Sequence, residues 1–455
     1  MHRINQRFRV ISGLFFITCL SGFMIIIPES AKAQTEIQHC YSLYPQNESI
    51  GLSAYMSNLT GYYSLFDLQN FQSDDEWDEN WDDVWDESGG KRISFHVRYN
   101  RVEGSYSGIR VEKDYWIQRY PNRPFLYGLA GYGLKAKKFE YQIGLEMGFF
   151  NDYRFAFGGE YHQVIDTPDR WIISDTENSL AAFFLQEDFH DFFMKEGGSG
   201  YITQNLTRTF VFSAGYHAEQ FDSLKKNTEW SLFGGKKRFP ENPSMDSGEL
   251  RSFMGGFVMD SRNSISQTTG GWYIQAEYEH AGEDIKSDFH FDRLMVDIRR
   301  YQSLGYFNGL DLRLRIGSSK GNLPWQKSFH LGGLSTLRGF PYKVFPEGRM
   351  HSGGNRMILA QAEYRMGSQD LPDEMGLWIL EELNIILFVD AGWVGYADED
   401  SPVYRGFKHL LWSSFKSDVG IALTNQEGNL RFEIARRTDT SHKPFVFLFR
   451  ISRSF

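Results

Sequence analysis

Residues 317–321 read Gly-Ser-Ser-Lys-Gly and satisfy the G-x-S-x-G spacing of a serine nucleophile. In hydrolases this motif lies on a sharp turn between a strand and a helix, which exposes the serine hydroxyl above a sheet. Here the five residues end a segment that alternates apolar and charged residues, and they lead into a long loop. The spacing therefore does not predict a serine hydrolase.

Histidine and cysteine also lack the spacing of a reactive or metal-binding site. The 12 histidines include no H-x-x-x-H pair, which is the arrangement that places two zinc ligands on one helix face. The 2 cysteines are Cys19 and Cys40, and only Cys40 follows the leader predicted below. A single cysteine forms neither an intramolecular disulfide nor a cysteine cluster. We expect no enzyme activity, no metal and no cofactor.

Charged side chains recur instead at every second position of apolar segments. In residues 310–316, Asp311, Arg313 and Arg315 alternate with leucine and isoleucine, and residues 272–279 show the same period. Successive side chains of a strand point to opposite faces, so one face is apolar and the other charged. This is the pattern of transmembrane strands that face lipid outside and a polar lumen inside.

The composition agrees with such strands. The chain has 44 Gly, 24 Tyr and 39 Phe, and its mean hydropathy of -0.44 is too polar for a bundle of membrane helices. Only apolar helices of about 20 residues or closed barrels satisfy all backbone groups in lipid. A net charge of -10 argues against binding to nucleic acid.

We therefore predict an all-β fold, a 16-stranded antiparallel transmembrane β-barrel with a long surface loop; that this loop is inward-folding is implied by the family resemblance described below. Residues 164–199 and 318–352 are too long for turns, and the first of these connections should contain a short helix. The expected strands are residues 92–101, 105–113, 124–135, 139–150, 153–163, 200–219, 227–237, 250–261, 270–281, 289–302, 306–317, 353–366, 383–395, 415–424, 428–437 and 443–455.

The N-terminus predicts export from the cytoplasm. Arg3, Arg7 and Arg9 precede an apolar run over residues 10–27, and Ala31-Lys32-Ala33 follows as an A-x-A cleavage pattern. Residues 1–33 are thus predicted to be a Sec-type signal peptide, removed before the barrel reaches the outer membrane. The alternative is an uncleaved helical anchor.

Four motifs in order resemble one known family. They are residues 255–279, LGGLSTLRGF at 331–340, GNRMILAQAEYR at 354–365 and FVDAG at 388–392. Together they resemble the barrel of the bacterial surface antigen superfamily, which includes BamA/TamA-type assembly factors and two-partner secretion transporters. Asn263 departs from the family's Asp-x-Arg-Asp turn. The resemblance implies an outer-membrane barrel over residues 91–455.

The resemblance further implies that the loop arginine, Arg338, folds into the barrel and pairs with Asp390, with Glu363 nearby. The residues support this, because alternation places both carboxylates on the polar face of their strands. Gly339 and Phe340 complete the loop motif, and glycine allows close approach to the wall. The alternative is an arginine on the rim of a flexible loop.

The last strand carries Phe447, Phe449, Ile451 and Phe455 on one parity. An aromatic end of this kind resembles the C-terminal signal by which outer-membrane proteins are inserted. It implies that the chain is itself a client of the outer-membrane assembly machinery, with outer-membrane lipids around it.

Residues 34–90 lack the pattern of the periplasmic client-binding modules of the family. They contain Trp77, Trp81 and Trp85 at intervals of four residues among carboxylates. On a helix these tryptophans would form one stripe. The stripe suits either contact with a periplasmic partner or a plug in the lumen, which offers Arg313, Arg315, Arg365 and Arg431. An acidic linker is the other interpretation, because like charges repel and aspartate is a mediocre helix former.

Two functions follow, from different classes. The first is insertion, assembly or translocation of proteins at the outer membrane, with protein clients or periplasmic chaperones as partners. The second is a passive or gated channel, or a structural barrel without assembly activity. Lipid transport is a third alternative, and the sequence names neither client nor solute.

Overall fold

The structure is a computed structural model, and the residues that it describes begin with the first strand. The predicted leader, residues 1–33, and the acidic segment of residues 34–90 with Trp77, Trp81 and Trp85 lie outside them. No helix in the described part is long and apolar enough to cross a membrane. The described residues are 93–111, 124–150, 155–207, 209–264, 268–305, 308–347, 353–367, 383–407, 410–425, 428, 430–440, 444–451 and 455.

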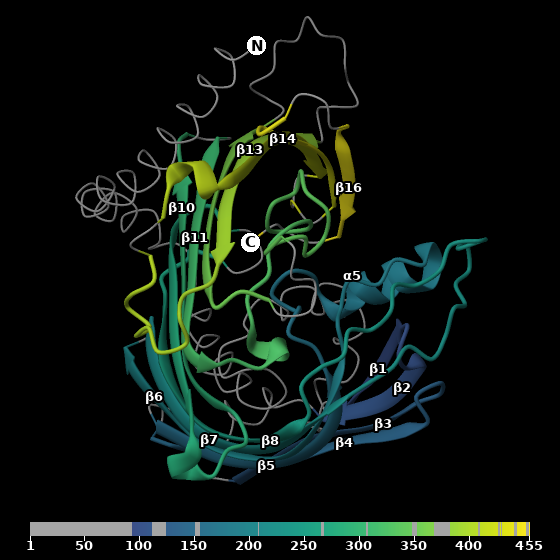
Figure 1. Ribbon diagram of the computed structural model, residues 1–455, viewed down its shortest axis with the longest axis vertical. Coiled ribbons are helices and arrows are strands. Elements are labelled where there is room, and N and C mark those ends of the chain that lie inside the picture. Colours follow the sequence, from purple (N-terminus) through teal and green to yellow (C-terminus); the bar gives the residue numbers. More distant parts are fainter. Residues whose placement is uncertain are drawn as a thin grey trace, which may run out of the picture.

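The strands form one 16-stranded sheet in which each strand pairs with its neighbours in sequence. The sheet curls around an interior, as Figure 1 shows. This confirms the all-β fold with sixteen antiparallel strands. The strands are β1 (Ile93–Asn100), β2 (Gly104–Val111), β3 (Pro124–Gly133), β4 (Lys138–Phe149), β5 (Phe155–Asp166), β6 (Phe193–Thr207), β7 (Phe210–Ser223), β8 (Gly248–Asp260), β9 (Gly271–Ala281), β10 (His290–Ser303), β11 (Gly309–Asn322), β12 (Arg356–Met366), β13 (Leu383–Gly395), β14 (Lys416–Asn425), β15 (Arg431–Arg437) and β16 (Val446–Arg450).

The sheet is not closed by strand pairing. In the described part of the chain, β1 and β16 are paired only with β2 and β15. We call the region between these two edges the seam. A short helix, α5 (Asp175–Leu180), lies between β16 and β1 in Figure 1.

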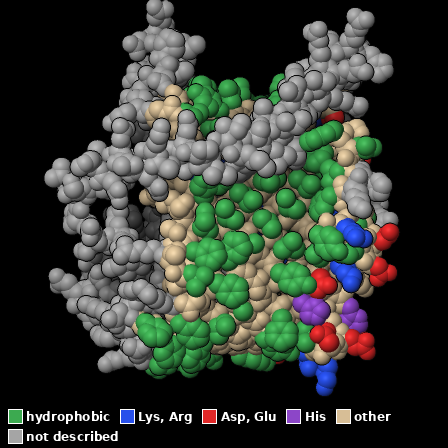
Figure 2. Space-filling model, turned by 90° about the vertical axis from the view of Figure 1, so that its left-hand side faces the viewer, with side chains coloured by type: hydrophobic (Ala, Val, Ile, Leu, Met, Phe, Trp, Pro, Cys, Tyr) green, Lys and Arg blue, Asp and Glu red, His purple; other side chains and the backbone are tan. Residues whose placement is uncertain are grey.

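Alternation explains which side of the sheet faces inward. On β4, Gln142 and Glu146 are buried, whereas Ile143 and Leu145 between them are exposed. Hydrophobic side chains spread over the outer wall in Figure 2. An exposed apolar surface of this extent suits lipid rather than water.

Two predicted strands are wrong, although the total is right. Residues 200–219 form two strands, because β6 and β7 meet in a tight turn after Thr207 that contains no glycine or proline. Residues 227–237 form no strand and belong to the β7–β8 connection. The two errors cancel in the count, because one predicted strand is in fact two and another is none. The first error arose because the alternation of β6 continues across the turn into β7.

The β5–β6 connection contains the expected short helix. Ser174 caps α5, since its hydroxyl accepts a hydrogen bond from the backbone N–H of Glu177 at 3.1 Å. A single π-helical turn, η7 (Ala181–Leu185), continues from α5. The connection is shorter than predicted because β6 already begins at Phe193.

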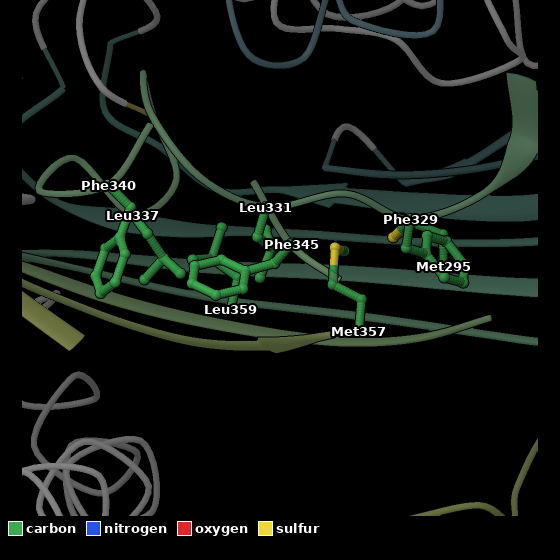
Figure 3. Packing of buried hydrophobic residues seen from close by; sticks show 8 residues of the cluster. All are labelled: Met295, Phe329, Leu331, Leu337, Phe340, Phe345, Met357 and Leu359. Carbon is green, nitrogen blue, oxygen red and sulfur yellow. The ribbon is translucent and has the colours of Figure 1, made fainter. Parts of the chain in front are cut away.

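The described residues of the β11–β12 connection, 323–347 and 353–355, fold inside the sheet. Figure 3 shows its apolar side chains on the wall, where Met295, Met357 and Leu359 come from β10 and β12. The loop contributes Phe329, Leu331, Leu337, Phe340 and Phe345. Burial of a large apolar side chain contributes about 1.5–3 kcal/mol, so packing alone holds much of this loop against the wall.

Candidate functional site

Arg338 lies at the inner end of the β11–β12 connection and is fully buried, with a relative exposure of 0%. Its guanidinium donates two hydrogen bonds to Asp390 on β13, from Nε at 2.7 Å and from Nη2 at 2.8 Å. Nη1 donates to Glu363 on β12 at 2.7 Å. The structure thus brings together Arg338, Asp390 and Glu363.

Two residues that the sequence analysis did not assign to this site complete it. Glu433 on β15 accepts a bond from Arg338 Nη1 at 3.2 Å, and Arg431 donates to Glu363 at 2.9 Å. Arg431 and Glu433 share one parity on β15, so alternation would have placed both in the lumen. We call Arg338, Glu363, Asp390, Arg431 and Glu433 the loop-lock cluster. Three carboxylates and two guanidiniums then share one buried site.

The glycine after Arg338 is required by space. A Cβ atom on Gly339 would lie 2.7 Å from the Cβ of Asp418 on β14 and 2.9 Å from the backbone nitrogen of Arg437 on β15. The loop backbone therefore contacts the wall at this residue. Phe340 follows and is buried, with the Arg437 guanidinium 4.3 Å from its ring centre.

A lysine attaches the same loop to the β5–β6 connection. Lys343 Nζ lies 2.7 Å from Asp169 and 2.5 Å from Asp191. Burial alone would lower the pKa of Lys343, but the two carboxylates outweigh burial and raise the pKa above its usual range. The lysine is therefore charged at neutral pH and joins the two connections.

Helix α5 satisfies backbone donors on both edges of the seam. Glu177 Oε1 accepts from Arg450 Nε at 2.7 Å and from the backbone N–H of Ile451 at 3.1 Å, both just at the end of β16. Ser179 Oγ accepts from the backbone N–H of Tyr99 on β1 at 3.2 Å. We call residues 174–187 the seam strap. It contacts the two edges that do not pair with each other.

Arg450 also connects the strap to the folded loop. Its Nη1 donates to the hydroxyl of Ser335, three residues before Arg338, at 2.6 Å. Arg450 is also the residue of β16 that Glu177 of the strap binds. Displacement of the loop would therefore remove Ser335 as a partner of Arg450. The loop and the strap share a contact at the seam.

The arginines proposed to receive a plug helix already have carboxylate partners. Arg313 and Arg315 bind Asp297 on β10 at 2.7 and 2.6 Å. Arg365 binds Asp311 at 2.9 Å, and Arg431 belongs to the loop-lock cluster. These contacts leave less positive charge for an acidic helix than the sequence suggested.

The C-terminal residues divide between the two faces. Phe447 and Phe449 are each 63% exposed on the outer face of β16, as their parity predicts. Phe455 departs from that prediction, because its ring lies 5.9 Å from the guanidinium carbon of the lumen-facing Arg313. The reason is that β16 ends at Arg450, so the alternation does not extend to the last residue.

The remaining reactive candidates lie in regular structure. Ser319 is buried within β11, where its hydroxyl donates to the carbonyl of Asn355 at 3.4 Å, and no helix follows it directly. Among the described residues, no group of three or more His, Cys, Asp or Glu side chains could hold a metal ion.

Comparison with known proteins identifies the family. A family model described as the Omp85 superfamily domain matches residues 192–455. The outer membrane protein assembly factor BamA of Nitratidesulfovibrio vulgaris is 24% identical over 245 residues, a match that covers 46% of this chain and 29% of BamA. The chain thus spans less than a third of the length of this curated relative.

A solved structure of BamA shares the fold. BamA from Haemophilus ducreyi lacking POTRA domains 1–3 superposes with a TM-score of 0.50 at 14% identity, over 79% of this chain and 70% of that one. CdiB from Escherichia coli gives a TM-score of 0.37 at 11% identity, over 76% and 58% of the two chains. At 14% identity, the similarity to the Haemophilus ducreyi structure shows a shared fold and nothing about function.

Proposed function

Because the chain belongs to the Omp85 superfamily, we propose that it inserts, assembles or translocates other proteins at the bacterial outer membrane. The relative with detectable sequence identity is named an assembly factor of that membrane. The proposal depends most on the seam, where β1 and β16 are the two ends of the sheet and α5 accepts from one backbone donor at each of them, Tyr99 and Ile451.

The seam gives the mechanism. An unpaired strand edge binds a further strand through backbone hydrogen bonds, without covalent chemistry and without cofactor. A client strand would take the place of Ser179 on the edge of β1 and of Glu177 on the end of β16. The seam strap must leave for this to happen, so opening is the regulated step.

The loop-lock cluster would then set how readily the seam opens. Arg338 holds the loop in the lumen, and Ser335 of that loop binds Arg450 next to the strap. A bidentate pair between guanidinium and carboxylate is directional as well as strong. Release of Arg338 would weaken the contacts of the strap with β16.

The experiment is depletion of the protein followed by quantification of every other outer-membrane protein. Rescue with the wild-type chain is compared with rescue by Arg338→Ala at matched barrel levels. Arg405→Ala is the control, because Arg405 is exposed on the β13–β14 connection. Loss of specific barrels or secreted proteins, restored by wild type and by Arg405→Ala only, supports the proposal. An unchanged inventory on depletion would overturn it.

A gated channel is the second candidate, favoured by a cavity of about 150 Å³ inside the sheet. Charged side chains line it, among them Lys195, Glu219, Glu277 and Arg293. This lining suits a small polar solute. Steady conductance in a planar bilayer, together with no client defect on depletion, would favour the channel.

The N-terminal assignments belong to the same proposal. Cleavage after Ala33 would deliver the barrel to the outer membrane, where its C-terminal aromatic residues would present it to the assembly machinery. We favour the linker or partner-binding interpretation of residues 34–90 over the plug, because the four lumen arginines already have carboxylate partners.

A further inference from the structure

The seam strap extends from the lumen to the lipid side of β1. On β1, Phe95 and Val97 are 85% and 72% exposed, and Tyr99 has the same parity but is only 7% exposed. Tyr99 is covered by Phe183 of the strap and Trp230 of the β7–β8 connection, at ring distances of 5.5 and 5.9 Å. The outer end of the strap therefore lies on the lipid-facing stripe of β1.

Here the strap and the β7–β8 connection join into one surface. The backbone N–H groups of Leu232 and Phe233 donate to the carbonyls of Phe183 and Phe184, at 2.7 and 3.0 Å. The connection runs beside α5 at the margin of the molecule in Figure 1. We call the exposed apolar residues of this joint surface the seam patch. They are Phe184 and Leu185 of the strap, and Trp230, Leu232 and Phe233 of the connection.

The seam patch is too apolar for a surface in water. Phe233 is 71% exposed and stacks on Phe184 at a ring distance of 6.0 Å. A contiguous apolar patch on a surface marks contact with a membrane or a protein. Since this patch continues the exposed stripe of β1, lipid is the occupant that its position favours.

Three cations follow the patch directly. Lys236, Lys237 and Arg238 are exposed. Lys237 pairs with Glu187. Among the described residues neither Lys236 nor Arg238 forms an ion pair, although Arg238 interacts electrostatically with Glu229 at longer range. Aromatic and aliphatic side chains next to exposed cations form the pattern of an element that enters the headgroup region of an anionic membrane.

We propose that the seam patch with Lys236 and Arg238 is a binding site for a phosphate-bearing anionic lipid of the outer leaflet. The apolar side chains contact the acyl chains, and the two cations contact the phosphate. The choice of leaflet rests on the proposed function in the outer membrane, where barrels have long loops at the cell surface and short periplasmic turns, so the long β5–β6, β7–β8 and β11–β12 connections lie at the cell surface. Bound lipid would hold the outer end of the seam strap in place.

The first experiment measures depth in the membrane with the full chain in vesicles of phosphatidylcholine, alone or mixed equally with phosphatidylglycerol. A fluorophore is attached at Phe233→Cys in a background with Cys19→Ser and Cys40→Ser. Tyr404→Cys is the control, because Tyr404 is exposed on the β13–β14 connection away from the patch. Lipids brominated along the acyl chain should quench the probe at residue 233 and leave the probe at 404 unchanged.

The second experiment tests the charge. Bound phosphatidylglycerol is counted on the detergent-purified full chain by native mass spectrometry. Lys236→Gln with Arg238→Gln should lower the apparent affinity on the order of 10-fold, from the electrostatic contribution of two cations. Lys286→Gln with Lys320→Gln removes the same charge from the β9–β11 region and should have no effect.

Either of two results would overturn the proposal: no quenching at residue 233, or equal lipid binding by the two double variants. Shielding of the probe only when a second protein is added would identify the patch as a protein-docking surface instead. No client enters these measurements. Failure of the lipid site and failure of the assembly function are therefore distinguishable.

Discussion

Replacing Arg338 by methionine would test whether the guanidinium holds the loop. The variant keeps an apolar stem beside Phe388, whose ring centre lies 3.5 Å from the guanidinium carbon. It removes both bonds to Asp390 and those to Glu363 and Glu433. Removing one partner of a buried ion pair costs about 3–5 kcal/mol, because the other partner stays buried without compensation.

That cost would appear as release of the loop. At about 1.4 kcal/mol per tenfold change, the released population should rise roughly a hundredfold to several thousandfold. Trypsin cleavage after Lys343, followed by mass spectrometry of the barrel in vesicles, measures this population when the loop opens and closes faster than it is cut. Arg405→Met controls for a general effect of losing a surface arginine.

A double-mutant cycle identifies the partner. If Arg338 and Asp390 act as a pair, Asp390→Asn should cost little more once Arg338 is methionine, leaving a coupling energy of about 1.5–3 kcal/mol. Cleavage of Arg338→Met within a few-fold of the wild-type rate would refute the reasoning. Additive effects of the two changes would also refute it, because Arg338 and Asp390 would then act independently and not as a pair.

Three further changes test neighbouring parts of the same site. Gly339→Ala places a Cβ 2.7 Å from that of Asp418. The overpacking costs about 1–3 kcal/mol and should speed trypsin cleavage after Lys343, although every charge is intact. Gly270→Ala is the control, because a Cβ there meets nothing within 4 Å and cleavage should stay unchanged. Glu177→Gln weakens the bonds to Arg450 by about 1.5–3 kcal/mol, so single-channel recordings should show more frequent openings, and unchanged recordings would contradict a strap that closes the seam. Asp297→Asn leaves Arg313 and Arg315 without their carboxylate. It should therefore lower the unfolding temperature of the barrel, measured by heating before gel electrophoresis. Asp292→Asn, which changes a partly exposed carboxylate of the same strand, should lower that temperature less.

Alternation along the chain predicted most of the strands because it is a local property. A strand that separates lipid from a polar lumen must change polarity at each residue, so β8 to β15 could be located to within a few residues. The prediction was wrong where another structure imitates the pattern. Residues 227–237 do not pair in the sheet: Trp230 covers Tyr99 of β1, and the backbone N–H of Leu232 binds the strap.

The sequence predicted only part of the candidate site, because alternation is local and does not show which distant residues meet. The order of motifs implied that Arg338, Glu363 and Asp390 meet, and alternation placed both carboxylates in the lumen. Glu433 has the same parity signal and was overlooked. Arg450 has the parity signal too, but nothing in the sequence points to its partner Glu177, which is 273 residues away.

The sequence by itself determined an all-β membrane architecture, its polar interior and the loop that carries Arg338, because each depends on residue type at fixed short spacing. Only the tertiary structure decided that β1 and β16 do not pair, that α5 binds both edges, and that Phe183 and Trp230 lie outside the sheet. These contacts depend on which segments meet after the sheet curls. No local pattern records that meeting, because the partners are brought together by the fold of the whole chain.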